Sequence, residues 1–197
     1  FSGAGKGTIV HELVDRYGYA VSISATTRDP RAGEQDGVHY FFKTKEEFEQ
    51  MIADGALIEY ASYVDNYYGT PRDYVEKQLE AGKNVILEIE IQGALQVKKK
   101  VPDALLVFIT PPSAQILEER LRGRGTETEE VIASRMARAA QEADGCEVYD
   151  YLVVNDKLDD SVTLIHQIIQ CEKNRMNQKL DLIEQIRSEL KEKAKGE

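Results

Sequence analysis

The sequence predicts an α/β fold with a mainly parallel sheet, and three observations lead to that prediction. Short apolar segments rich in β-forming residues alternate with amphipathic segments of about 10 to 15 residues, which is the rhythm of βαβ units. With 197 residues, 42% of them hydrophobic and 30% charged, the chain has the size and composition of one globular domain with a buried core. Between about residues 25 and 68, aromatic strands and turn residues interrupt the rhythm, which indicates an inserted β-containing unit.

The positions of the elements follow from apolar spacing and capping residues. Apolar side chains recur at i, i+3, i+4 and i+7 from Val10 to Tyr17, which predicts a helix from Lys6 to about Tyr17. Thr44 and Glu47 form a capping box that begins a second helix. The expected helices span about residues 6–17, 44–55, 71–81, 94–100, 113–123, 128–143 and 161 onward, and the expected strands span 19–24, 38–43, 57–64, 84–90, 105–110 and 151–154.

The charge balance restricts the partners. The chain has 25 Lys and Arg against 35 Asp and Glu, a formal net charge of −10, whereas a nucleic-acid binder needs a basic surface. A small phosphorylated ligand in a local basic pocket remains compatible with this balance. Cys146 and Cys171 are too few for a disulfide framework and fit a reducing compartment. We expect a soluble cytoplasmic protein without a membrane or nucleic-acid partner, because no apolar run is long enough to cross a bilayer and no signal peptide is present.

A glycine-rich loop stands at the start of the chain. The run FSGAGKGT, residues 1–8, precedes the first helix, so that backbone N–H groups and the helix N-terminus favour a bound phosphate. Lys6 adds a full positive charge, as in the general phosphate-loop pattern G-x-x-x-x-G-K-[ST]. Gly7 stands at the Ser/Thr position of that pattern, Thr8 follows it, and the first glycine would precede residue 1. We therefore expect a short N-terminal segment with a core strand ahead of residue 1; a plain helix-capping turn is the alternative for the loop.

Two arginines form a second basic site in this acidic chain. Arg28 and Arg31 lie three residues apart among hydroxyl residues, and guanidinium groups match phosphate oxygens in bidentate geometry. Tyr40 on the following strand adds a phenolic hydroxyl. A solvated surface loop is the alternative interpretation.

The residues around these arginines carry a longer pattern. From Thr26 to Lys43 the spacing is T-T-R-x2-R-x2-E-x2-G-x2-Y-x-F-K, and the later segments include NYYGTP (66–71), LEIEIQG (87–93), RLRGRGTE (120–127) and VVND (153–156). In this pattern the chain resembles the guanylate kinases over about residues 1–175. The resemblance implies a three-layer phosphate-loop core (1–24, 70–120 and 144–175), a GMP-binding subdomain (about 25–69) and a helical lid (about 121–143), all within one domain over 1–197. A charged C-terminal helix (about 161–197) is the last element of this domain.

The resemblance also implies an activity, in which the γ-phosphoryl group of ATP passes in line to GMP, with Mg²⁺, to give ADP and GDP in purine nucleotide metabolism. The compound dGMP is expected as a second acceptor. Guanine presents N1–H and N2–H donors, so carboxylate and hydroxyl acceptors select it, whereas adenine would leave them unpaired.

The roles implied for individual residues fall into four groups. Phosphoryl transfer is assigned to Lys6, Arg28, Arg120, Arg124 and Arg135, and the GMP phosphate to Ser24, Arg28, Arg31, Tyr40 and Tyr68. Guanine is assigned to Glu59, Thr70 and Glu88, and Mg²⁺ to Thr8 and Glu90. ATP is assigned to Phe1, Ser2, Gly3, Ala4, Gly5, Lys6, Gly7, Thr8, Arg124 and Asn155, with Asn155 acting largely through its backbone.

Plainer interpretations exist for some of these residues. Glu59 and Glu88 are also what structural salt bridges would need, and Tyr68 and Thr70 are also typical of a packing pair at a strand end. Glu90, where many members of the family carry Asp, suits the N-cap of a helix.

Two other functions are compatible with parts of the pattern. One is a catalytically silent guanylate-kinase-like module that binds peptides, which the intact Gly5 and Lys6 disfavour. The other is a nucleoside monophosphate kinase for a different base, which Glu59, Thr70 and Glu88 disfavour. The segment 176–190 keeps apolar residues among many charges, as in a solvated amphipathic helix or an oligomer contact, and the chain is expected to be a monomer or a homodimer.

Overall fold

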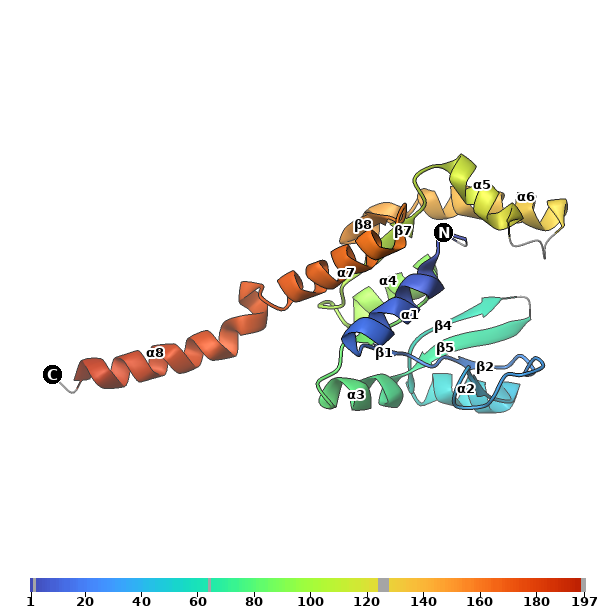
Figure 1. Cartoon of the computed structure of the whole chain (residues 1–197). Helices are drawn as coiled ribbons and strands as arrows, with labels where there is room; N and C mark the ends of the chain where they lie inside the picture. The colour runs from blue at the N-terminus through green and yellow to red at the C-terminus, as the bar shows by residue number, and fades with distance from the viewer. Residues whose placement is uncertain (2, 64, 124–127, 196–197) are drawn as a thin grey trace.

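The computed structural model describes residues 1, 3–63, 65–123 and 128–195 (Figure 1). The helices are α1 (Lys6–Tyr17), α2 (Lys45–Ala53), α3 (Arg72–Glu80), α4 (Ile91–Lys100), α5 (Ala114–Arg122), α6 (Glu129–Ala143), α7 (Leu158–Glu172) and α8 (Leu180–Lys195), with short 3-10 helices η1 (Cys146–Val148) and η2 (Met176–Lys179). The strands are β1 (Ala20–Val21), β2 (Ala25–Thr26), β3 (Phe41–Phe42), β4 (Leu57–Tyr63), β5 (Asn66–Pro71), β6 (Val85–Ile86), β7 (Val107–Thr110) and β8 (Tyr151–Val154).

Parallel strand pairs form the centre of the α/β core. β1 pairs with β6 and β7 pairs with β8, both in parallel, as the alternation of strands and helices predicts. Helices α1 and α7 pack against each other and against these strands, because the helix faces that carry Ile9, Leu13, Val162 and Ile165 are buried. The glycine-rich loop enters this core through Ala4, whose side chain is fully buried. The loop is therefore anchored in the apolar interior.

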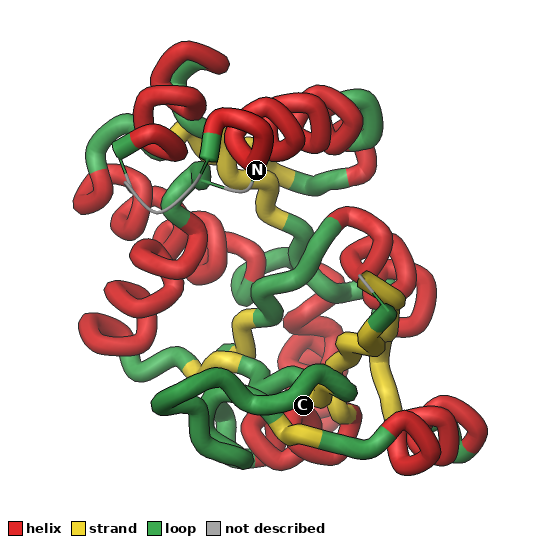
Figure 2. The backbone as a smooth tube through the Cα atoms, turned by 90° about the vertical axis from the view of Figure 1, so that its right-hand side faces the viewer, coloured by secondary structure: helices red, strands yellow, loops and turns green. Residues whose placement is uncertain are grey.

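The β-rich stretch forms a separate four-stranded sheet. Its order is β3-β2-β5-β4, with β2–β3 parallel and the other pairs antiparallel. Helix α2 covers it through Phe48, which is fully buried beside Ala25 and Leu57. The predicted capping box of Thr44 and Glu47 is confirmed at the start of α2. This sheet lies at the bottom of the molecule, and α5 and α6 lie at the top, in two perpendicular views (Figures 1 and 2).

Helices α5 and α6 pack side by side through Leu117, Leu121, Ile132 and Ala139. Their predicted caps are confirmed, because the hydroxyl of Ser113 accepts a hydrogen bond from the N–H of Ile116 and that of Thr128 from Val131. The ring of Phe1 also packs against this helix pair. Phe1 thus links the glycine-rich loop to α5.

Several elements differ from the expected boundaries. Strand β5 was not expected, since Asn, Gly and Pro are unfavourable in strands; it forms because it pairs with β4 on one side and β2 on the other. The expected strand 38–43 is reduced to β3 because residues 35–40 form a turn, with the N–H of Gly37 donating to the carbonyl of Tyr40. The expected strands 19–24 and 84–90 are likewise reduced to two residues each, and α4 begins three residues earlier than expected.

The C-terminal segment is not one continuous helix. It begins at Leu158 and stops after α7, where the N–H groups of Asn174 and Arg175 bond three residues back, to Cys171 and Glu172. The side chain of Asn174 also donates to the carbonyl of Gln170, which competes with helix continuation. Helix α8 then projects away from the rest of the chain (Figure 1).

Candidate active site

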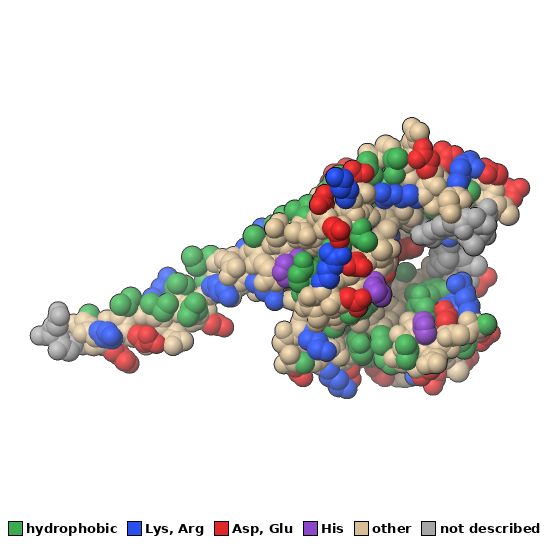
Figure 3. Space-filling model, viewed as in Figure 1, with side chains coloured by type: hydrophobic (Ala, Val, Ile, Leu, Met, Phe, Trp, Pro, Cys, Tyr) green, Lys and Arg blue, Asp and Glu red, His purple; other side chains and the backbone are tan. Residues whose placement is uncertain are grey.

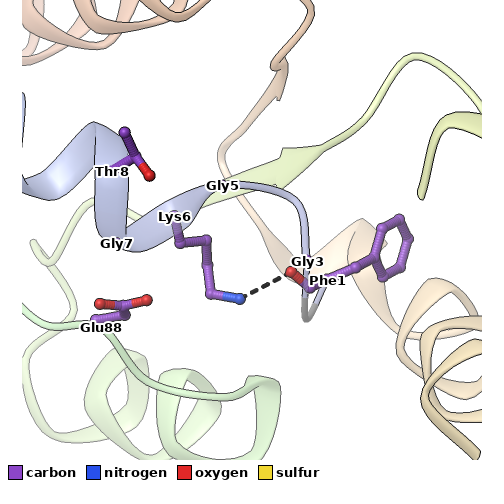
Figure 4. A pocket seen from close by; sticks show the side chains of 7 residues that line it. All are labelled: Phe1, Gly3, Gly5, Lys6, Gly7, Thr8 and Glu88. Carbon is purple, nitrogen blue, oxygen red and sulfur yellow. Dashed lines mark hydrogen bonds between the residues drawn. The ribbon is translucent and has the colours of Figure 1, made fainter. Parts of the chain in front are cut away.

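The glycine-rich loop forms one wall of a cavity of about 270 Å³ at the N-terminus of α1. Its lining residues are Phe1, Gly3, Gly5, Lys6, Gly7, Thr8 and Glu88. In Figure 4 the side chains of Lys6 and Glu88 lie on the same side of the loop. The Nζ of Lys6 donates to the carbonyl oxygen of Phe1 at 3.0 Å, so that the ammonium group is held across the loop. A cationic group and the positive end of a helix therefore meet in this cavity.

The buried side chain of Asn155 forms a hydrogen bond with the backbone of the loop. Its Nδ2 donates to the carbonyl of Ala4 at 2.8 Å. Gly5, at φ 88°, caps α1, and a Cβ there would stand 2.5 Å from this Nδ2. Only glycine fits a left-handed position so close to the amide. The sequence predicts Asn155 near ATP through its backbone; the structure adds a contact of its side chain with the loop.

Replacing Asn155 by alanine is expected to loosen the loop. The change leaves the Ala4 carbonyl without its buried donor, which costs about 1–3 kcal/mol of stability. We expect a lower Tm and a KM for ATP raised about tenfold, the equivalent of roughly 1.4 kcal/mol, with little effect on the KM for GMP. The matched control is Asn174→Ala, which removes an exposed amide bonded to the carbonyl of Gln170. Equal effects of the two substitutions on the KM for ATP would contradict this role of Asn155.

The second cluster surrounds Arg28 on the four-stranded sheet. Its two terminal nitrogens donate to the two carboxylate oxygens of Glu34, each at 3.0 Å, and the guanidinium lies 5.4 Å from the ring centroid of Tyr40. The rings of Tyr40 and Tyr68 are 6.2 Å apart. Glu34 also accepts the backbone N–H of Arg31 at 2.7 Å. The structure thus brings the predicted phosphate-binding residues Arg28, Tyr40 and Tyr68 together, with the exposed Arg31 beside them.

Ser24 lies next to this cluster. Its carbonyl oxygen accepts a hydrogen bond from the N–H of Phe41 at 2.9 Å, and this bond joins the residue before β2 to β3. The aromatic ring of Phe42 lies 5.9 Å from the Arg28 guanidinium. Ser24 therefore lies directly before β2 and opposite Phe41, the residue that follows Tyr40.

Glu34 is a functional candidate that the sequence interpretation contains only as a motif position. Arg28 holds the pKa of Glu34 down to about 2, with the N–H of Arg31 adding to the effect. The two side chains are 16% and 17% exposed, so the pair is sheltered from solvent. Because the folded pKa lies below the ordinary value of 4.5, the pair stabilises the fold above pH 4.5 and loses this contribution as the pH falls toward 2.

The pH dependence of stability gives a test of this pair. We expect Glu34→Gln to lower Tm at pH 7, with a difference from the wild type that shrinks below pH 4.5 and vanishes near pH 2. Differential scanning calorimetry across this range measures it. Glu49→Gln, on the exposed side of α2, is the control for a general effect of removing one carboxylate. A difference that stays constant with pH would show that the charge on Glu34 is not involved.

The predicted guanine-reading residues divide between two places. Glu59 on β4 accepts a hydrogen bond from the hydroxyl of Thr70 on β5 at 2.7 Å, and both side chains are buried. Burial raises the pKa of Glu59, and the hydrogen bond from Thr70 opposes this shift. Gly93 on α4 approaches so closely that a Cβ there would lie 2.7 Å from the Glu59 carboxylate. Glu88 lies instead in the cavity of the glycine-rich loop.

The hydrogen-bonded partner of Glu59 is a hydroxyl, in place of the Lys or Arg that a structural salt bridge would need. Its second carboxylate oxygen lies against Gly93, where the four-stranded sheet meets the core helix α4. Glu59 and Thr70 therefore stand at the junction of the sheet and the core.

The arginines near α5 and α6 are arranged differently. Arg120 on α5 donates to the carbonyl of Asp156 at 3.5 Å, next to Asn155. Arg135 lies half-buried on α6, and Arg124 and Ser2 lie outside the described residues. Glu90 is the N-cap residue of α4, yet its carboxylate does not cap the helix and pairs with Arg138 of α6. Sequence reasoning did not predict this ion pair.

The oxygen donors in the loop cavity fit a magnesium ion. Thr8 and Glu88 both line it, and Mg²⁺ binds through one or two protein oxygens together with substrate phosphates. Glu90, the other residue predicted to hold the metal, is not among the residues that line this cavity. Within the described residues, no group of three or more His, Cys, Asp and Glu side chains forms a metal site of its own.

These features define a class of protein. A glycine-rich loop at the first helix of a parallel α/β core, with a separate basic and aromatic cluster on a second sheet, is typical of phosphate-loop proteins that bind nucleotides. The family model "Guanylate kinase" matches residues 1–172. The chain belongs to the guanylate kinase family, whose members are transferases.

Individual relatives agree with this assignment. A guanylate kinase of Oceanobacillus iheyensis is 53% identical over 172 residues, 87% of this chain and 84% of the relative. One from Caldanaerobacter subterraneus subsp. tengcongensis is 50% identical over 189 residues, 95% of this chain and 92% of the relative. The crystal structure of guanylate kinase from Anaplasma phagocytophilum superposes with a TM-score of 0.69 at 31% identity, covering 86% of this chain and 83% of that one.

None of the helices in the described residues combines the length and the hydrophobicity needed to cross a bilayer.

Proposed function

We propose that this chain transfers the γ-phosphoryl group of ATP to GMP, and to dGMP as a second acceptor. The observation that carries the proposal is the presence of two separate basic sites within one chain. A cationic loop cavity with Lys6 lies on the core, and a basic cluster with Arg28 lies on the separate sheet. The surface is hollowed between the α5–α6 side and the sheet (Figure 3). We assign the two basic sites, together with this hollow, to a donor and an acceptor nucleotide.

The loop cavity is assigned to the donor. Backbone N–H groups at the start of α1 and the ammonium of Lys6 bind the β- and γ-phosphates, and Thr8 and Glu88 would hold Mg²⁺. Bound there, the ion supplies positive charge to the phosphate oxygens. Arg120 and Arg135, together with Arg124, are assigned to the charge that develops on the transferring group. The hydrogen bond of Asn155 to the Ala4 carbonyl holds the backbone of the loop in place.

The sheet is assigned to the acceptor. Arg28, Arg31, Tyr40, Tyr68 and Ser24 bind the GMP phosphate, whose oxygen attacks the γ-phosphorus in line. Arg28 exchanges its bond with Glu34 for the phosphate, because a guanidinium fork fits either partner. Glu59 and Thr70 accept hydrogen bonds from guanine, whereas Glu88, which the sequence also assigned to guanine, lies in the loop cavity. Closure of α6 over the site excludes water that would otherwise hydrolyse ATP.

An acceptor panel tests the function. The chain is incubated with MgATP and GMP, dGMP, AMP or UMP, and ADP formation is followed. We expect turnover with GMP, lower turnover with dGMP, and none above background with AMP or UMP. Turnover with AMP and not with GMP would overturn the base assignment. Absence of turnover with every acceptor, together with binding of a peptide, would favour the silent module. A cytoplasmic location stays a prediction from the use of cysteine, since Cys146 and Cys171 are both free.

A further inference from the structure

Helix α8 carries an apolar surface that no other part of the described chain covers. Leu180, Leu182, Ile186 and Leu190 are between 40% and 61% exposed, and Ile183 is half-buried. At 100° per residue Ile183, Ile186 and Leu190 lie within about 60° of one another, with Leu182 and Leu180 flanking them on either side. Figure 3 shows apolar side chains along the length of the helix. Contiguous exposed apolar surface of this kind marks an interaction site.

The helix has little support within its own chain. It packs on η2, the turn directly before it, and projects away from the core (Figure 1). Its internal side-chain bonds include Gln185 with Glu189 and Arg187 with Glu184, all exposed. A lone helix of 16 residues is only marginally stable in water, so burial of the apolar face has to come from another molecule.

The charges along α8 indicate which molecule this is. The first half, 180–186, carries Asp181 and Glu184 and no basic residue, a charge of −2. The second half, through residue 193, carries three basic residues against Glu189 and Glu192, a charge of +1. Two copies of α8 in antiparallel orientation place the acidic half of each against the basic half of the other. A parallel pair would place like charges together.

The shape of the molecule allows this pairing. Because α8 leaves the core at its N-terminal end, an antiparallel pair keeps the two cores at opposite ends of the helices (Figure 1). The hollow assigned to the nucleotides lies on the side of the molecule away from α8 (Figure 3). The guanylate kinase family model also ends at residue 172, before α8 begins. Pairing through α8 therefore leaves the nucleotide sites uncovered.

We propose that two copies of this chain associate through their α8 helices, packed antiparallel along the face of Ile183, Ile186 and Leu190. The acidic first half of each helix pairs with the basic second half of its partner. This association is independent of the proposed catalytic function, since none of the residues assigned to ATP or GMP lies on α8.

Multi-angle light scattering after gel filtration, over a series of protein concentrations, tests the association. The wild type is expected to reach twice the 22.2 kDa mass of one chain, and Ile183→Asp/Leu190→Asp is expected to remain at the mass of one chain. Both proteins should show the same phosphoryl-transfer rate and the same unfolding of the core, which shows that the substitutions act on association alone. A wild type that stays at one-chain mass throughout, or a double variant that still doubles, would overturn the proposal.

The orientation is tested by reversing charges. Asp181→Lys/Glu184→Lys makes both halves basic, and Lys191→Glu/Lys193→Glu makes both acidic, so each pair of changes should weaken dimers by tenfold or more in Kd. Combining all four restores opposite halves and should recover dimers, with circular dichroism confirming that the helix is kept. If the fourfold variant associates no better than the two double variants, the antiparallel arrangement is wrong.

Discussion

Replacing Lys6 by methionine is expected to lower kcat by about 10²- to 10³-fold, the loss typical for removing one group that stabilises transition-state charge. Lys6 is the cationic side chain in the loop cavity, and methionine keeps its length without its charge. Substrate charge spreads over the γ-phosphate oxygens during transfer, so the effect should fall on kcat more than on the KM for GMP. A coupled assay of ADP formation measures it.

The control for Lys6 is Lys77→Met on α3, which removes an exposed ammonium outside the loop cavity. It should leave kcat unchanged. Because Lys6 also bonds the Phe1 carbonyl, Tm is measured for both variants to separate lost charge from a disordered loop. A Lys6→Met protein with kcat within threefold of the wild type would contradict the assignment of the loop to ATP.

Replacing Glu59 by glutamine is expected to lower kcat/KM for GMP by about 10- to 100-fold, because hydrogen bonds to a charged group contribute about 1.5–3 kcal/mol. The amide of glutamine presents a donor where guanine also presents one, so one of the two contacts is lost. The buried position keeps its shape and its bond from Thr70. Stability should be kept or increased, since burial disfavours the charged form of Glu59.

Two further variants sharpen this result. Thr70→Val removes the hydroxyl that donates to Glu59 and leaves a buried carboxylate oxygen unpaired, which should cost about 1–3 kcal/mol of stability. Glu80→Gln, at the exposed end of α3, should change neither activity nor stability. Equal kcat/KM for GMP in Glu59→Gln and the wild type would mean that Glu59 is only a structural partner of Thr70.

Local signals in the sequence predicted much of the fold. The capping box of Thr44 and Glu47 and the caps at Ser113 and Thr128 depend on residues within one helical turn, and all are confirmed. Strand β5 could not be predicted locally, because its Gly69 and Pro71 are poor strand residues and only pairing with β2 and β4 holds them extended. The same limit applies wherever tertiary pairing outweighs local propensity.

In the candidate site, too, the sequence predicted the features that depend on neighbouring residues and missed those that depend on tertiary contacts. Lys6 and the glycines around it were recognisable from their spacing alone, since one short loop contains them. The contact of Asn155 with the Ala4 carbonyl joins residues 151 positions apart, and the ion pair of Glu90 with Arg138 joins residues 48 apart. Neither has a local signal. For Glu34 a signal was present in the motif, but its bidentate bond to Arg28 required the fold of the loop between them.

The most direct test of two separate nucleotide sites is titration calorimetry of GMP into the wild type, Lys6→Met and Glu59→Gln. We predict that GMP binds the Lys6 variant with the wild-type Kd and binds the Glu59 variant at least tenfold more weakly. A Kd for GMP that is weakened by the Lys6 substitution and unchanged by the Glu59 substitution would place the acceptor in the loop cavity and contradict the account.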